Sequence, residues 1–470
     1  MLKKTFSNNE KATYYLTSVL IAVSCCIIFY PGIFSNDSFN QINQAITSRY
    51  NSWHPAIMAI LMHYLYKPFG VGGIFLLHQV LYWLAWALFF DIVLGKRKKI
   101  YLLTGFFTPF FLISLTVWKD TGMMISLFLS STLIYYFFKY HKSFVLIPIF
   151  LLLAYAFNVR TNGFIIVGTL IFIFVSAYWF TRKTKVLASV IVGAISATLC
   201  STLFFSLNSS INKYYEVEQV SALPSLVLYD AAGTFYNAEL GRTPPPSWAE
   251  KNLKNSSSWI SEYNEKVCSL CWTSNITCNG NPNMNSVYLT YWVKTILEHP
   301  VDYIKHRTAF ISNLFGINFP TYYPYHSHKQ QNSYEEQFHI NHLGIVFLYP
   351  MYILSYLLSI FHLYQPALYV LLSIFCFLDS LKRFICKKDF SLDRILTLSL
   401  SGSSIISALS LAFLAVAADY RYMIWSVLGG FISMLITFKR EDSTARFSPP
   451  SNRPGAGVVI LTNVKRETIY

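Results

Sequence analysis

The sequence predicts an all-α polytopic membrane protein with about ten to twelve transmembrane helices, interfacial helices and a large extracytoplasmic loop subdomain. Of the 470 residues, 54% are hydrophobic and only 13% are charged, whereas soluble globular domains carry about a quarter charged residues. Apolar runs of about twenty residues recur along the chain, the length that crosses a hydrocarbon core as a helix. Short clusters of Lys and Arg separate these runs, so membrane orientation explains the net charge of +15 without a nucleic-acid partner.

The first apolar run, residues 14–30, follows a short segment with three lysines. We interpret this run as an uncleaved signal anchor with a cytoplasmic N-terminus, because it is long and no small-x-small cleavage site follows it. Residues 72–94 form the next full run and end in the basic cluster 95–99, which indicates the cytoplasmic side. Residues 56–68, in between, are too short to span a membrane and are expected to form an interfacial helix on the outer side.

The later apolar runs alternate between outer and inner ends. Each inner turn is a run of Lys and Arg, whereas each outer turn carries an isolated charged residue or pair. The alternation fails between residues 208 and 382, so the number of crossings there stays open. The runs are 101–117, 121–138, 144–157, 164–180, 186–207, 343–360, 367–381, 395–417 and 423–438.

This pattern divides the chain into four units. Residues 1–207 form an N-terminal transmembrane module with a first outer loop at 31–55, and this module is expected to hold the catalytic site. Residues 208–339 are polar and rich in turn residues, which predicts an extracytoplasmic loop subdomain. Residues 340–440 form C-terminal transmembrane helices, and residues 441–470 are expected to be a disordered cytosolic tail.

The first outer loop is the most distinctive stretch. Pro31 and Gly32 stop the first helix, and the polar residues that follow offer caps for a new one. On that new helix Asp37 and Gln41 lie four residues apart and share a face. His54 closes the loop beside an aromatic residue suited to a membrane interface.

Further charged groups fall at the outer ends of later helices. They are Lys119 with Asp120, Arg160 with Asn162, and Asp419 with Arg421. Each has a structural alternative, such as a helix cap for Asp37, interfacial anchors for Lys119 and Asp120, or a local ion pair for Asp419 and Arg421. Arg160 is less easily explained this way, because an outward-facing Arg between apolar helices calls for an anionic partner.

Acids and cations on one membrane face fit a particular chemistry. A carboxylate acts as general base on a hydroxyl acceptor, while Arg and Lys bind a phosphate leaving group and stabilise its growing charge. The arrangement therefore predicts transfer of a group from a phosphorylated lipid carrier. No dedicated metal site is expected, although a divalent cation stays an option.

These features also resemble the GT-C superfamily of polyprenyl-phosphate-sugar-dependent integral-membrane glycosyltransferases. The resemblance rests on the turn at Pro31 and Gly32, the acid in the first outer loop, the His54–Pro55 pair before an interfacial helix, an outer acid at the next outward helix end, and the large late loop. It covers about the first two hundred residues and is topological. The size and the late loop are similar to phage or bacterial O-antigen glucosyltransferases of the serotype-converting kind.

The resemblance implies an inverting glycosyltransferase in a bacterial inner membrane that moves a sugar from a polyprenyl-phosphate donor to a glycan or lipid-linked acceptor, such as the O-antigen of lipopolysaccharide. Asp37 then matches the first catalytic acid and Asp120 the second. Lys119 and Arg160 fall where the family binds the lipid phosphate. Asn162, His54, Gln41, Asp419 and Arg421 are the further candidates for substrate binding.

Two other classes remain as alternatives. A lipid-linked oligosaccharide flippase or transporter would place ionisable groups near the bilayer midplane and show repeated halves, but midspan ionisable residues are few, His78 being the clearest. A membrane acyltransferase would need a His base, for which His54 and His63 are candidates. The loop cysteines Cys268, Cys271 and Cys278 lack the fourth ligand of a structural zinc site and are expected to form a disulfide in an extracytoplasmic loop. Cys271–Cys278 is favoured, because a bridge within a CxxC motif tends to be strained and reducible.

Overall fold

The computed structural model describes residues 8–182, 184–241, 243–244, 246–250, 259–260, 263–266, 280–317 and 342–439. The predicted all-α class is confirmed: helices form the described part of the chain, and its only β-structure is three isolated bridges. The expected disulfide among Cys268, Cys271 and Cys278 and the expected tail at 441–470 lie outside the described residues.

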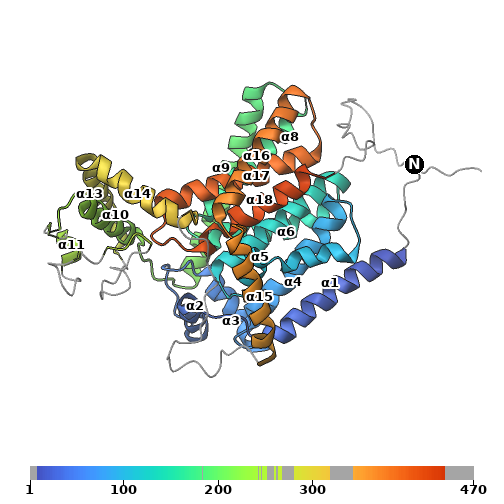
Figure 1. Cartoon of the computed structure of the whole chain (residues 1–470), viewed down its shortest axis with the longest axis horizontal. Coiled ribbons are helices and arrows are strands. Elements are labelled where there is room, and N and C mark those ends of the chain that lie inside the picture. Colours follow the sequence, from blue (N-terminus) through green and yellow to red (C-terminus); the bar gives the residue numbers. More distant parts are fainter. Residues whose placement is uncertain are drawn as a thin grey trace, which may run out of the picture.

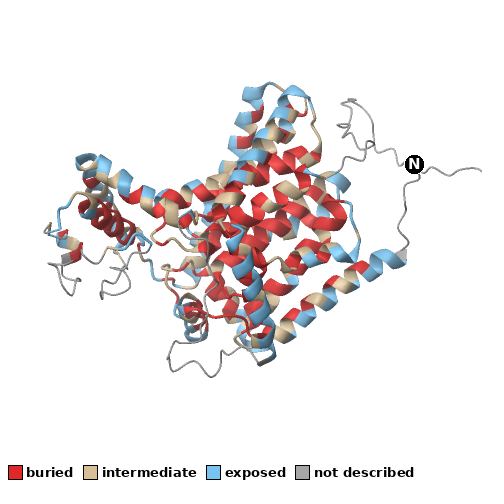
Figure 2. Ribbon diagram, in the orientation of Figure 1, coloured by how far each residue is buried: buried red, intermediate tan, exposed pale blue. Residues whose placement is uncertain are grey.

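Seven described helices are long and apolar enough to cross a membrane, which supports a multi-pass membrane protein. The run 143–159 is apolar but shorter, so the expected ten to twelve crossings stay a prediction. Large apolar side chains on α1, α9 and α15 are exposed, as lipid-facing positions require (Figure 2). The seven candidates lie in α1 (Asn8–Phe29), α4 (Gly73–Leu88) with the π-helical turn η1 (Phe89–Val93), α6 (Lys119–Tyr140), α8 (Gly163–Phe180), α9 (Val186–Tyr214), α15 (His342–Ile360) and α17 (Leu392–Leu414).

The prediction of one continuous helix at 101–117 is wrong. The segment is a 3-10 helix, η2 (Lys99–Phe106), followed by the short helix α5 (Thr108–Ser114). Pro109 explains the break, since it lacks the N–H that a helix continuing from η2 would need. A 3-10 helix rises about 2 Å per residue and an α-helix about 1.5 Å, so the lengths of the two pieces add to roughly 27 Å.

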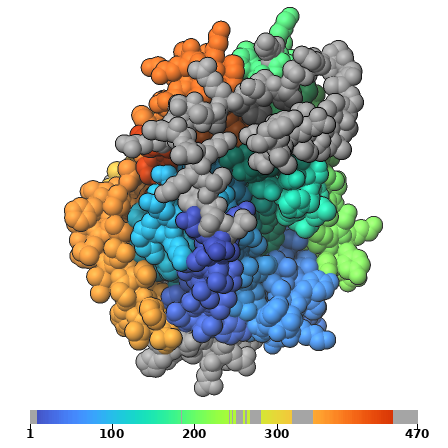
Figure 3. All heavy atoms as spheres, turned by 90° about the vertical axis from the view of Figure 1, so that its right-hand side faces the viewer, coloured from blue at the N-terminus to red at the C-terminus, as the bar shows by residue number. Residues whose placement is uncertain are grey.

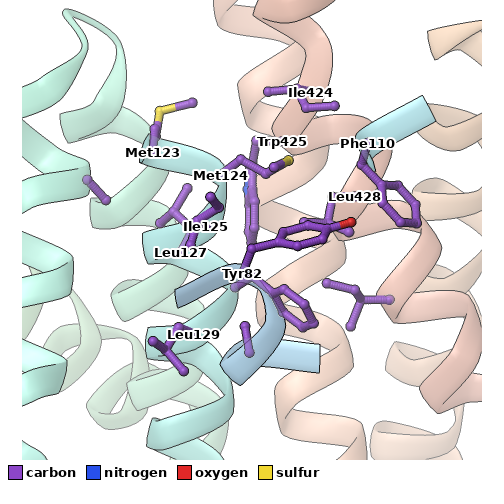
Figure 4. Close-up of a cluster of buried hydrophobic side chains, with 14 of the residues drawn as sticks. Tyr82, Phe110, Met123, Met124, Ile125, Leu127, Leu129, Ile424, Trp425 and Leu428 are labelled. Atoms are coloured by element: carbon purple, nitrogen blue, oxygen red, sulfur yellow. The ribbon is translucent and has the colours of Figure 1, made fainter. Parts of the chain in front are cut away.

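The centre of the bundle is a dense apolar core. Tyr82 of α4, Phe110 of α5 and Trp425 of α18 (Ile424–Thr437) are fully buried there against the apolar side chains of α6 (Figure 4). Such close packing holds the ends of these helices in fixed positions. The N-terminal ends of α6 and α18, which carry predicted site residues, are thereby fixed relative to each other.

Small residues bring the C-terminal helices close together. α18 packs on α16 (Pro366–Cys386) and α17, which presents a row of buried serines. A Cβ atom on Gly430 would lie 2.4 Å from the Tyr369 backbone oxygen, and one on Gly429 would lie 2.1 Å from Ser404 Oγ. Close helix contact through small residues is typical of membrane bundles. Here it sets the position of the segment that precedes α18.

A second, smaller apolar core lies at the end of the molecule opposite the start of α1, where side chains of the loop region pack with residues of α16 and α17 (Figure 1). The helices of the loop region pack on one another, and α14 also contacts the outer end of α17. The predicted loop subdomain therefore rests directly on the helix bundle. Its helices are α10 (Leu223–Asn237), α11 (Ser247–Glu250), the 3-10 turn η4 (Pro282–Met284), α13 (Asn285–Glu298) and α14 (Pro300–Leu314).

Two short helices, α2 (Asn36–Thr47) and α3 (Ile57–Phe69), pack on each other at the same end of the bundle. The turn before α2 depends on Gly32, which has a φ of 96° and whose absent Cβ would lie 2.9 Å from the Phe75 ring. The remaining elements are the turn η3 (Ser143–Val145), α7 (Leu146–Val159) and the 3-10 turn η6 (Tyr420–Met423).

Candidate functional site

The first outer loop is hydrogen-bonded to the start of α6. Ile33 and the segment before α6 form a short parallel bridge, in which the Ile33 N–H donates to Leu115 O at 2.9 Å and the Val117 N–H donates to Ile33 O at 2.9 Å. Ser38 Oγ donates to Val117 O at 2.6 Å, and Trp118 Nε1 donates to Ser35 Oγ at 2.6 Å. These bonds fix the first turn of α2, which carries Asp37, against the residues that precede Lys119.

Asp37 pairs with an arginine from the far end of the chain. Arg421 Nη1 lies 2.7 Å from Asp37 Oδ2, and Arg421 Nε lies 2.9 Å from Asp419 Oδ2. The Arg421 guanidinium also lies over the Trp118 ring, 4.8 Å from its centre. One cation thus bridges two carboxylates, which remain the more accessible members of the group at 19% and 21% exposure.

These contacts shift the pKa of both partners. Burial alone would raise the pKa of Asp37, but the charges of Arg421 and Lys119 outweigh it and lower that pKa from 3.8 to about 2. Burial would lower the pKa of Arg421, yet the neighbouring Asp419 and Asp37 raise it overall. Asp37 is therefore ionised and Arg421 is protonated at neutral pH.

His54 connects Asp37 to Lys119. Lys119 Nζ donates to His54 Nδ1 at 2.8 Å, so the ring proton is on Nε2, which lies 3.7 Å from Asp37 Oδ1. Burial and the nearby charge of Lys119 lower the pKa of His54 to about 3, which leaves the ring neutral at pH 7. Lys119 makes no ion pair with a carboxylate of the described residues.

Asp120 and Arg160 form a second, deeper ion pair between the Asp120 Oδ1 and Arg160 Nη1 atoms. Asp120 has no exposed surface, and the guanidinium of Arg160 lies over the Tyr422 ring at 4.4 Å from its centre. Burial lowers the pKa of Arg160 to about 10, which still leaves it charged at neutral pH. Asp120 therefore orients Arg160 from behind, and Tyr422 holds the other face of the guanidinium.

The structure thus brings together the seven charged or titratable residues predicted for the outer face: Asp37, His54, Lys119, Asp120, Arg160, Asp419 and Arg421. We call these seven the outer charge cluster. Three carboxylates and three cationic side chains meet in it, and because His54 is neutral their formal charges sum to zero.

The other two predicted residues, Gln41 and Asn162, are buried within four residues of a cluster member along the chain, Asp37 and Arg160 respectively. The Nε2 atom of Gln41 and both amide atoms of Asn162 have no hydrogen-bond partner among the described residues. Buried amides without partners cost free energy, so such groups are suited to a bound polar ligand.

Two aromatic residues of the site had no role assigned from sequence. Trp118 and Tyr422 form ring faces against which Arg421 and Arg160 pack. Their positions directly beside Lys119 and Arg421 were the available signal, because aromatic residues adjacent to outer-face cations commonly stack on them.

A second buried polar cluster, in the loop subdomain, was missed from sequence. Asp230 accepts from Trp292 Nε1 at 2.7 Å and lies 3.0 Å from His306 Nε2 and 2.5 Å from Arg307 Nη2. Arg307 Nη1 also donates to Ala415 O at 2.9 Å, at the end of α17. This cluster joins the loop subdomain to the membrane bundle a few residues before Asp419.

Among the described residues, no group of three or more His, Cys, Asp and Glu side chains could hold a metal ion. Each carboxylate of the outer charge cluster instead faces a cation. Comparisons of the chain with protein-family models, with curated proteins and with solved structures find no match.

Proposed function

We propose that the outer charge cluster is the active site of an integral-membrane glycosyltransferase of the GT-C type. It would transfer a sugar from a polyprenyl-phosphate donor to a glycan or lipid-linked acceptor. In the reaction the acceptor hydroxyl oxygen bonds to the anomeric carbon with inversion, and its proton passes to Asp37. The bond from the anomeric carbon to the phosphate oxygen breaks, and polyprenyl phosphate leaves with the electron pair.

The observation that carries this proposal is the convergence of acids and cations from four distant segments on one end of the bundle. The first outer loop, the start of α6, the turn before α8 and the turn before α18 each contribute charged side chains. The longest basic clusters lie at the opposite ends of the helices, the end at which α1 begins (Figure 1). We therefore propose that the cluster lies on the extracytoplasmic side of a bacterial inner membrane and that the N-terminus is cytoplasmic.

Asp37 is the best-placed general base. It is ionised at neutral pH, it is more exposed than Asp120, and its partner Arg421 is also within reach of Asp419. A carboxylate with so low a pKa is a weak base, but its basicity rises if Arg421 turns from Asp37 toward an incoming phosphate. Anion binding and base activation are coupled in this way.

Lys119 and Arg160 are the phosphate-binding groups in this proposal. Among the described residues, Lys119 contacts only the neutral His54 within hydrogen-bonding distance and forms no ion pair, so its amino group is open to an incoming anion. Arg160 has its Nε atom buried without a hydrogen-bond partner among the described residues, which leaves a donor for a phosphate oxygen. Asp120, which is fully buried behind Arg160, serves as a positioning residue.

The alternative of an acyltransferase loses support at both candidate histidines. Burial and Lys119 keep His54 from accepting a proton near pH 7, and its Nδ1 atom is already bonded to Lys119. His63 Nδ1 lies 2.7 Å from Ala45 O and thus joins α3 to α2. Neither ring is placed as the base that such a reaction needs.

A transfer assay with purified protein in proteoliposomes tests the proposal, using polyprenyl-phosphate glucose as donor and a lipid-linked glycan as acceptor. Asp37→Asn keeps an oxygen that accepts from Arg421 but cannot take the proton. We expect turnover to fall by roughly 10²–10⁴-fold with donor binding retained. Asp302→Asn, at a partly buried carboxylate of the loop subdomain outside the cluster, is the matched control and should stay within about twofold.

Wild-type turnover in a correctly inserted Asp37→Asn protein would show that Asp37 is only a structural partner of Arg421 in the first turn of α2. Movement of intact lipid-linked sugar across the bilayer, with no transfer, would favour the flippase instead.

A further inference from the structure

The opposite end of the molecule contains a cavity of about 600 Å³, within the size range of small-molecule binding sites. It lies between the N-terminal part of α1, the turn η1, the end of α6 and the turn η3. Figure 3 views the molecule from this end, with α1 in dark blue.

The polar lining of this cavity carries an excess of positive charge. Lys11, Arg97 and Lys142 line it, against the single carboxylate of Asp91. Asp91 is already occupied, because it pairs with Arg97 and accepts from Tyr15 Oη at 2.6 Å. Lys11 and Lys142 make no ion pair with a described carboxylate. The cavity therefore has a net charge of about +2 that its own side chains leave unbalanced.

The remaining lining is apolar or aromatic and continues onto the lipid-facing surface. Leu88, Ile92, Leu133 and Val145 form walls of the cavity. Phe144, at its edge, is 69% exposed, and Ile147 on the next turn of α7 is equally exposed. A ligand held by the lysines would thus have apolar protein surface beside it, in the direction in which acyl chains run.

We propose that this cavity binds the phosphate headgroup of an anionic membrane phospholipid, with the acyl chains along Phe144 and α7. Basic pockets between transmembrane helices on the cytoplasmic side recognise acidic headgroups in this manner. The site is independent of the sugar-transfer proposal, since it lies at the other end of the helices and shares no residue with the outer charge cluster. A lipid bound there links α1, through Lys11, to the connection between α6 and α7, through Lys142.

Lipid binding to the purified full chain in neutral detergent, counted by native mass spectrometry, tests the site. Dioleoyl phosphatidylglycerol and dioleoyl phosphatidylcholine are the two probes. Each lysine near an anionic headgroup contributes about 1 kcal/mol, so Lys11→Gln with Lys142→Gln should weaken phosphatidylglycerol binding roughly 30-fold. Lys387→Gln with Lys388→Gln removes two exposed lysines outside the cavity and should leave the tightest binding event within about twofold.

Two further measurements separate a lipid from a free phosphate compound. Phe144→Ser should weaken dioleoyl phosphatidylglycerol more than its short-chain dihexanoyl form, because only the long chains reach past the edge of the cavity. Inorganic diphosphate should fail to displace the lipid at equal concentration. Displacement by diphosphate would assign the site to a soluble anion and overturn the proposal. Equal binding of both lipids, or equal loss in the two double variants, would also overturn it.

Discussion

The Asp120–Arg160 pair permits a quantitative test of the claim that Asp120 positions Arg160. Asp120 has no exposed surface, and Arg160 is buried against the Tyr422 ring. Arg160→Gln leaves a carboxylate with no water contact, and breaking a buried ion pair in this way costs about 3–5 kcal/mol of unfolding free energy. Asp120→Asn should cost less, about 1–3 kcal/mol, because Arg160 keeps its ring contact and the attraction of nearby Asp37 and Asp419.

The double variant distinguishes a coupled pair from two independent residues. An Asn and a Gln in the same positions leave no buried charge, so the combined loss should fall short of the sum by about 2 kcal/mol or more. Titration of SDS into detergent micelles, followed by circular dichroism, measures the unfolding free energies. The exposed pair Lys294–Glu298 is the control, since exposed helical pairs couple by no more than about 0.5 kcal/mol.

The same variants separate positioning from catalysis. Asp120→Asn should raise the KM for the polyprenyl-phosphate donor while kcat changes little, because the cation is present but less well oriented. Losses that add to within about 0.5 kcal/mol would refute the coupling. A fall in kcat alone, with an unchanged KM, would instead indicate that Asp120 takes part directly in the reaction.

Three further predictions follow from the fold and the site. Because the pKa of Asp37 in the folded protein lies near 2, below its ordinary 3.8, its ionisation stabilises the fold by about 2 kcal/mol above pH 4, and this contribution is lost as the pH falls from 4 toward 2. Asp37→Asn should therefore show a flatter dependence of unfolding free energy on pH in that interval, and an unchanged slope would contradict the assignment. Gly430→Ala should lower the free energy of unfolding by about 1–3 kcal/mol, because its Cβ would meet a backbone oxygen. Gly429→Ala should cost less, because its methyl group meets only a serine hydroxyl that rotates away. Equal thermal stability of the two variants would argue against close packing at this point. Arg307→Met should leave the buried Asp230 without its main cation and increase the rate of proteolysis of the loop subdomain. Adding Asp230→Asn removes the unpaired charge and should restore part of the resistance to proteolysis. Identical cleavage of both variants and wild type would show that the pair does not stabilise the subdomain.

Much of the outer charge cluster could be predicted from topology. If basic clusters lie inside, the charged residues at the other helix ends must share one face, and Asp37, Lys119 and Arg160 follow from that rule alone. The pairing could not be predicted. Which acid meets Arg421 depends on how α18 packs on α16 and α17, through close contacts at Gly430 that no helix-end pattern encodes.

Two other differences between the sequence prediction and the structure have identifiable physical causes. The run 101–117 has the length and hydropathy of a span, but hydropathy does not register the missing N–H of Pro109. The Asp230–Arg307 cluster lies in a polar loop, where polar residues are expected to face water. Its burial depends on tertiary contacts of α10 with α13 and α14, which a single sequence does not show.

The zero net charge of the outer charge cluster has a kinetic consequence. A site with unbalanced cations attracts anions through the solvent and loses that attraction as salt is added. Three acids balanced by three cations produce little field beyond their own contacts. Capture of a lipid-borne anion at this face should therefore proceed by lateral diffusion within the bilayer, at a rate nearly independent of ionic strength. Free phosphate in the aqueous phase, which has neither the steering field nor the lipid chain, should compete poorly for the same cations.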